Sequence, residues 1–303
     1  MKPSPLFSAA LALLACSPPL RADAPRFTRE LKPALLSARD ADLRTVAARF
    51  AFGARQDIAV PALSAAWFAD TKGVLALKSR ANPETISAQL GAEYFERFGG
   101  TVVLAPTQPI FDPNAPPPPL APAAAGTRDY LVGAGLKVGF ESDQRFDNSQ
   151  FTVGPRLSFT HTENSGLWPL LPSVTLAYQR VRAVRARFLA DHAISERNFW
   201  RLDLVAAWKW RPFERAGVAA DSPLAPLGLH ADVRYFQAYA LPAKAKALGH
   251  QEEAFYTAGT VSYDTGRLHW KYLHDIYVTV ARGRIPPSTR EDTTLYVGVT
   301  LLR

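Results

Sequence analysis

The sequence contains almost no cysteine, because Cys16 is the only one among 303 residues. A single cysteine excludes an internal disulfide and any zinc or iron–sulfur site built from several cysteines. No apolar run reaches the ~20 residues that a membrane-spanning helix needs, which excludes a helical membrane protein. With 48% hydrophobic and 20% charged residues, the chain also lies outside the composition of disordered proteins. A soluble globular protein or a β-barrel remains.

The N-terminus has the pattern of a secretory signal peptide. Lys2 precedes a short apolar segment, and Leu20-Arg21-Ala22 provides a cleavage site, so we predict a signal peptide over residues 1–22. The alternative is a lipoprotein signal, since Leu13-Leu14-Ala15-Cys16 places the only cysteine where a lipid would be attached. Either route takes the protein out of the cytoplasm. The net charge of +8 is not concentrated in a basic block, so we expect no nucleic-acid partner.

A proline-rich stretch divides the chain. Eight prolines lie within residues 106–122, which excludes a helix or an internal strand there. We therefore predict a loop or linker over residues 106–128, with residues 23–105 before it and residues 129–303 after it.

Residues 129–303 alternate between apolar and polar side chains, which is the two-residue period of β-strands. In the clearest segment, tryptophan, leucine and alanine share one face while Arg201, Asp203 and Lys209 lie on the other. We predict eight strands in this region, at Tyr130–Glu141, Phe151–Phe159, Val174–Gln179, Trp200–Arg211, Leu229–Tyr239, Phe255–Tyr263, Leu268–Val280 and Leu295–Leu301.

The pattern before the proline-rich stretch is weaker, and two organisations stay open. Four further strands, at Arg44–Ala54, Asp57–Phe68, Gly73–Arg80 and Thr85–Arg97, would complete an all-β, antiparallel transmembrane barrel of about twelve strands. The alternative is an eight-stranded barrel over residues 129–303, with residues 23–105 forming a small N-terminal periplasmic domain.

Three features favour a membrane barrel over a soluble sheet protein. Many of the predicted strands have about ten residues, which suits a tilted crossing of the bilayer, whereas strands of soluble proteins cluster near ~5 to 6 residues. Aromatic residues mark the ends of several apolar faces, as in Trp200 with Trp208 and Trp210. The opposite faces carry arginine, lysine, aspartate and glycine, as a polar lumen requires.

These patterns resemble the outer-membrane β-barrel proteins of Gram-negative bacteria as a class, without pointing to one family. The resemblance implies Sec-type export, an outer-membrane location, and contact with outer-membrane lipid and the insertion machinery. The chain ends Leu302-Arg303 rather than on the terminal aromatic residue that is usual in the class. If the C-terminus is periplasmic, we expect a short periplasmic turn at Asp264–Gly266 and an extracellular loop at Pro286–Pro287. The proline-rich stretch would then be periplasmic.

The predicted lumen faces carry an excess of positive charge. The pore-lining candidates are the cations Arg156, Arg201, Lys209, Arg211, Arg234 and Lys271 and the anions Asp203, Asp232 and Asp275. Six cations against three anions favour anions in an open pore. Arginine–carboxylate pairs that close the lumen explain the same residues equally well.

Three functions follow from this interpretation. The first is a narrow porin-like or transport channel without chemistry. The second is a structural or assembly barrel with a closed lumen, whose proline-rich segment contacts a periplasmic protein. The third is a membrane-embedded lipid hydrolase, in which His161 or His192 would activate a nearby serine, although neither lies in a nucleophile motif. We therefore expect no enzyme activity, and the residue spacing predicts neither a cofactor nor a metal site.

Overall fold

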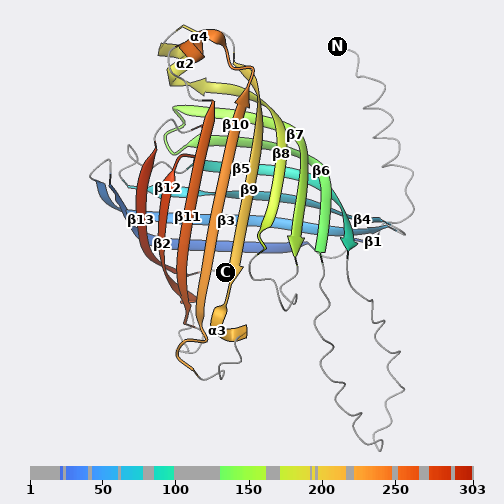
Figure 1. Ribbon diagram of the computed structural model, residues 1–303, viewed down its shortest axis with the longest axis vertical. Helices are drawn as coiled ribbons and strands as arrows, with labels where there is room; N and C mark the ends of the chain where they lie inside the picture. The colour runs from blue at the N-terminus through green and yellow to red at the C-terminus, as the bar shows by residue number, and fades with distance from the viewer. Residues whose placement is uncertain are drawn as a thin grey trace, which may run out of the picture.

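The protein forms a closed antiparallel β-barrel, seen in the computed structural model (Figure 1). Strand β13 pairs with β2, so the twelve strands β2 to β13 close the sheet on itself. The structure describes residues 21–22, 25–39, 43–60, 63–77, 85–98, 130–161, 171–191, 193–194, 197–215, 222–247, 252–265, 273–287 and 291–301. The prediction of a twelve-stranded all-β barrel is confirmed.

The strands are long enough for a tilted crossing of a bilayer, at 9 to 18 residues each. The barrel strands are β2 (Arg26–Ala38), β3 (Leu43–Val60), β4 (Leu63–Ala76), β5 (Thr85–Phe98), β6 (Tyr130–Asp143), β7 (Asn148–His161), β8 (Ser173–Ala186), β9 (Asn198–Trp210), β10 (Leu227–Tyr239), β11 (Glu253–Asp264), β12 (Asp275–Gly283) and β13 (Asp292–Thr300). A two-residue strand, β1 (Arg21–Ala22), pairs with β3.

In the part of the chain that the structure describes, three short helices lie in the connections between strands. They are α2 (Arg187–Asp191), α3 (Pro212–Arg215) and α4 (Ala243–Ala247). Figure 1 shows α2 and α4 at one end of the barrel and α3 at the other. Among the described residues, no helix combines the length and the apolar character that spanning a membrane requires.

Before the proline-rich stretch, the predicted number of strands is right, but two of the four predicted positions are wrong and one strand was missed. The predicted strand Asp57–Phe68 contains the reversal between β3 and β4, and Gly73–Arg80 begins near the end of β4. Strand β2 was not predicted, because Pro33 interrupts its pattern. The paired register of β13 with β2 stops at Ala34, next to this proline. The missing N–H of Pro33 therefore removes no backbone hydrogen bond from the paired part of these strands.

The apolar strand faces point outward, and the polar faces line the interior. On β6, Val132, Leu136 and Val138 are exposed on the outer surface while Lys137 and Glu141 face inward. The inward glycines of this region are required by close packing: a Cβ at Gly135 would lie 2.1 Å from the carbonyl oxygen of Ala92. An apolar outer face with a polar lumen is the arrangement of a membrane barrel.

Outward-facing aromatic residues gather near both ends of the barrel. Tyr178 stacks on Trp200 with ring centroids 5.1 Å apart, and Tyr239 lies beside Tyr178. Trp210 is exposed at the other end of the same strand as Trp200. This placement fits the aromatic girdles that lie at the two membrane interfaces.

The barrel has two ends. The end at which strand β13 finishes is called the C-terminal end, and the other is called the opposite end. Strand β5 finishes and β6 starts at the C-terminal end, where Phe98 pairs with Tyr130, so the proline-rich connection leaves the barrel there. The predicted turn at Asp264–Gly266 is wrong. The backbone N–H of Thr265 donates to the carbonyl of His274, so the chain does not reverse within three residues, and β12 starts only at Asp275.

The candidate site in the barrel lumen

The lumen has a filled side and a hollow side. The filled side lies along β6 to β9, where inward-facing charged and amide side chains pair with one another. The hollow side lies mainly along β2 to β4 and β9 to β12, where polar side chains surround a cavity. The hollow side therefore leaves space inside the barrel for a solute.

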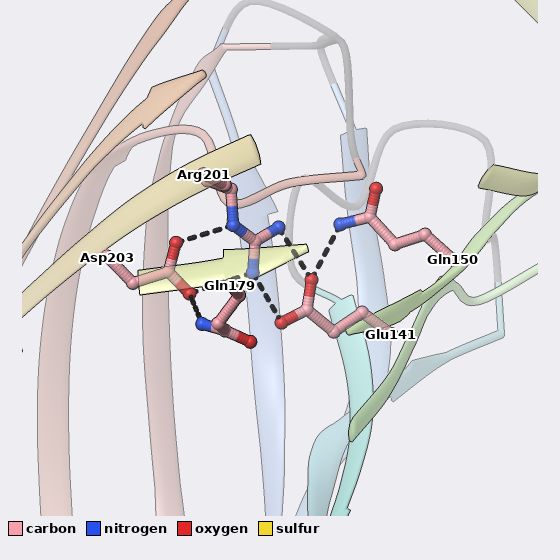
Figure 2. Close-up of polar contacts among 5 residues, drawn as sticks. All are labelled: Glu141, Gln150, Gln179, Arg201 and Asp203. Carbon is pink, nitrogen blue, oxygen red and sulfur yellow. Dashed lines mark hydrogen bonds and ion pairs between the residues drawn. The ribbon is translucent and has the colours of Figure 1, made fainter. Parts of the chain in front are cut away.

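Arg201 organises the filled side (Figure 2). Its Nη1 and Nη2 donate to the two carboxylate oxygens of Glu141 at 2.9 and 2.8 Å, which joins β9 to β6 across two intervening strands. Its Nε and Nη2 donate to the carboxylate of Asp203 at 2.5 and 2.8 Å. The amides of Gln150 and Gln179 donate to Glu141 and Asp203 respectively, which completes the network. Arg201 is 1% exposed, so this network closes its part of the lumen.

A second ion pair lies on the same side. Arg156 Nε is 2.7 Å from Glu93 Oε1, and the guanidinium of Arg156 lies over the ring of Phe68. Lys137 is buried close to the Arg201 network. The charges of this side are therefore held in packed contacts and do not face open water.

Part of the lumen toward the opposite end is apolar. Leu36 and Val74 face inward from β2 and β4 and pack in one buried cluster with Tyr277 and Tyr296. This cluster narrows the interior on the side of β2 to β4, and the cavity lies alongside it.

The hollow side contains a polar cavity of about 350 Å³. Its charged lining consists of the cations Lys32, Arg49, Lys72, Lys209, Arg211 and Arg234 and the carboxylates Glu30, Asp232, Asp264 and Asp275, together with His230. The lining thus has two more cations than carboxylates. An excess of positive charge on a polar wall would favour anions over cations of the same size.

A short segment after β12 separates this cavity from a second, smaller one. Ile285 lines the polar cavity and packs against Tyr256, Ala258 and Ala281. Its neighbours Arg284, Pro286 and Pro287 line the second cavity, which measures about 100 Å³ and lies under α2 and α4. The N–H of Arg284 donates to the carbonyl of Phe255 at 3.0 Å, which ties the segment to β11. Ile285 therefore stands at the inner limit of the polar cavity.

The structure divides the predicted pore-lining residues between the two sides. Lys209, Arg211, Asp232, Arg234 and Asp275 line the polar cavity. Arg201 and Asp203 lie in the closed network, and Arg156 lies in the second ion pair. Lys271 and the lipidation candidate Cys16 lie outside the described residues, as do the first twenty residues of the predicted signal peptide and the proline-rich stretch.

Several lumen residues were not predicted as site residues. Lys32 and Lys72 were missed because they fall outside the predicted strands, whereas Arg49 lies in the predicted strand Arg44–Ala54, whose lumen face was not assigned. Glu141 is the last residue of the predicted strand Tyr130–Glu141, but its role depends on Arg201, 60 positions later in the chain. The alternation of β6 and β9 could have placed both residues inside, though it could not have paired them.

The histidines proposed for lipid hydrolysis fall where the structure does not describe side chains. His161 is the last residue of β7, and its side chain lies outside the described part of the structure. His192, Ser165 and Ser195 lie outside those residues. The described residues also contain no cluster of three histidine, aspartate, glutamate or cysteine side chains that could hold a metal ion.

Comparisons with known proteins find likeness only among solved structures. No protein-family model and no curated protein matches the sequence. A NanC porin is 10% identical, with 91% of this chain and 100% of that chain covered and a TM-score of 0.40. The outer-membrane protein OprD of Pseudomonas aeruginosa is 12% identical, over 88% and 65% of the two chains, with a TM-score of 0.35. Outer-membrane phospholipase A of Escherichia coli is also 12% identical, over 91% and 90%, with a TM-score of 0.34.

Likeness at this level carries no argument about function. These relatives include a porin and a phospholipase, so their names also point to different activities. The barrel assignment rests on the strand pairing of this chain, which closes from β13 to β2.

Proposed function

We propose that this protein is an outer-membrane β-barrel that acts as a narrow, porin-like channel favouring anions. The observation that carries the proposal is the polar cavity inside the closed barrel, with six cationic and four acidic side chains on its wall. A barrel with no transport role has no need for a hydrated interior with unbalanced charge.

The outer surface supports the membrane location. Leucine, valine and isoleucine are exposed on the outward faces of most strands, including Leu136, Leu204 and Val280. Leaving this apolar band in water would be unfavourable by roughly 25 cal/mol for each Å². These faces are therefore proposed to contact outer-membrane lipid. The protein would be exported through the Sec pathway and then inserted into the outer membrane by the insertion machinery.

The filled side explains why the channel would be narrow. Twelve strands leave more interior space than side chains fill in a barrel of eight. The Arg201 network and the Leu36–Tyr296 cluster occupy part of that space, which confines solutes to the cavity along β2 to β4 and β9 to β12. Ile285 then forms the constriction toward the opposite end.

The second candidate function is a structural or assembly barrel with a closed lumen. The Arg201 network and the segment at Arg284–Pro287 favour it, because both fill the interior. In this case the proline-rich stretch at the C-terminal end would be the contact for a periplasmic partner.

Liposome swelling separates the two candidates. Purified protein is inserted into liposomes, its heat-dependent gel migration confirms a folded barrel, and swelling is followed in iso-osmotic solutions of small solutes. A channel predicts swelling that is faster for small anions than for cations of equal size. Absence of swelling with every solute, from liposomes that contain folded protein, would favour the closed barrel.

A further inference from the structure

We propose that the lumen contains an oxyanion-binding site between Lys72 of β4 and Arg234 of β10, suited to a small solute with a carboxylate or phosphate group. This inference rests on the proposed function, because it assigns the class of solute that the channel carries. It goes beyond general anion preference, since it places a discrete binding site at one level of the lumen.

Two of the cavity cations near the C-terminal end, Lys32 and Arg211, have carboxylate partners. Lys32 Nζ is 2.6 Å from Glu30 Oε1, and Arg211 Nη2 is 3.9 Å from Asp264 Oδ2. These pairs reduce the field that a solute meets at that end. The cavity cations outside these pairs include Lys72 and Arg234, which lie deeper in the lumen.

Lys72 and Arg234 form no ion pair with any described residue. Both side chains line the polar cavity, and each lies close enough to the other for their like charges to interact. Asp70 and Asp232 also act on Lys72, but neither lies within ion-pair distance of it. Two neighbouring cations without a bound counter-charge are unfavourable, so an anion between them would be stabilised by both.

Arg234 carries a second sign of a missing ligand. Its Nε is buried and has no hydrogen-bond acceptor among the described residues, while its guanidinium lies over the ring of Tyr256 at 5.4 Å. A buried donor without an acceptor is rare in folded proteins and commonly marks an ion or water that belongs at the site. The Tyr256 ring covers one face of the guanidinium, and the side chain also lines the polar cavity.

The surroundings suit a small organic anion. The cavity of about 350 Å³ lies within the ~300 to 1,000 Å³ of pockets that bind small molecules. Ser87 and Thr260 also line it, and their hydroxyl groups can donate to oxygen atoms of the solute. Lys72 lies deep within the barrel and yet its side chain is accessible, because it extends into the hollow part of the lumen.

Calorimetric titration of the folded barrel in a neutral detergent tests the site, with inorganic phosphate and acetate as probes and glycerol as the uncharged control. Ionic strength is held constant, because salt screens the charges of the lumen. We expect saturable binding of phosphate, acetate or both. The probe that binds more tightly shows whether the site prefers a phosphate or a carboxylate group. We expect each of the variants Lys72→Gln and Arg234→Gln to weaken binding about tenfold, as loss of one charge-assisted hydrogen bond predicts.

Lys209→Gln is the matched control, because it removes the same charge from the same cavity nearer the C-terminal end. We expect it to change affinity less than about threefold. An equal loss in all three variants, or no oxyanion binding to the wild-type barrel, would overturn the site. Heat-dependent gel migration checks that each variant is folded. If the protein carries current in a planar bilayer but binds no oxyanion, only the proposed binding site is overturned. If it binds an oxyanion but carries no current, only the proposed channel function is overturned.

Discussion

Replacing Arg201 with methionine should destabilise the barrel strongly, because it removes the centre of a buried charge network. Arg201 donates four hydrogen bonds, two to Glu141 and two to Asp203, and is 1% exposed. The variant would leave both carboxylates facing one another without their cation. Removing one partner of a buried pair costs about 3 to 5 kcal/mol, so we expect a loss of that size in the free energy of unfolding.

Urea unfolding in lipid vesicles, followed by tryptophan fluorescence, measures the change. Lys32→Met is the control, because the Lys32–Glu30 pair is partly exposed and its loss should cost less than about 1 kcal/mol. The triple variant Arg201→Met, Glu141→Gln, Asp203→Asn should recover most of the stability, since it removes the uncompensated charges together. If Arg201→Met unfolds at the same urea concentration as the wild type, the network does not hold the filled side together.

Three other predictions test the membrane face, the location and the constriction. Leu204→Arg, in the middle of the outward face of β9, should reduce the free energy of unfolding by about 2 to 4 kcal/mol. Ser262→Arg, on the cavity wall, should change that free energy much less. Equal losses for the two variants in the same urea assay would contradict the assigned faces. The protein should fractionate with the outer membrane and migrate differently on gels before and after boiling, because a closed barrel keeps its backbone groups paired; recovery in a soluble periplasmic fraction would contradict the membrane location. Ile285→Gly should raise the single-channel conductance by opening the inner limit of the polar cavity, and an unchanged conductance would show that the constriction lies elsewhere.

The sequence predicts the barrel well where apolar and polar residues contrast strongly. On β9, tryptophans and leucines alternate with Arg201, Asp203 and Lys209, and the structure places the first group outside and the second inside. On β3 and β4 the contrast is weaker, because alanines such as Ala47 and Ala66 face the interior in place of charged residues. The reversal between these two strands was consequently placed inside a predicted strand.

The division of the lumen could not be predicted from the sequence. Whether an inward arginine closes a barrel or lines a cavity depends on the residues opposite it, and those come from other strands. Arg201 meets Glu141 from β6, while Arg234 meets Tyr256 from β11 and, within the described strands, no carboxylate. Both arginines have the same sequence signature, a cation on the polar face of an alternating strand. Pairing between strands and the register of each pair decide their different roles.

The reversal potential of single channels in a planar bilayer tests the central claim most directly. With a KCl gradient across the membrane, an excess of lumen cations makes chloride more permeant than potassium, which fixes the sign of the potential at zero current. We predict a reversal potential with the sign of chloride selectivity, and a smaller reversal potential in the variant Arg234→Gln. A reversal potential of potassium selectivity, or no current from folded and inserted protein, would contradict an anion-favouring channel.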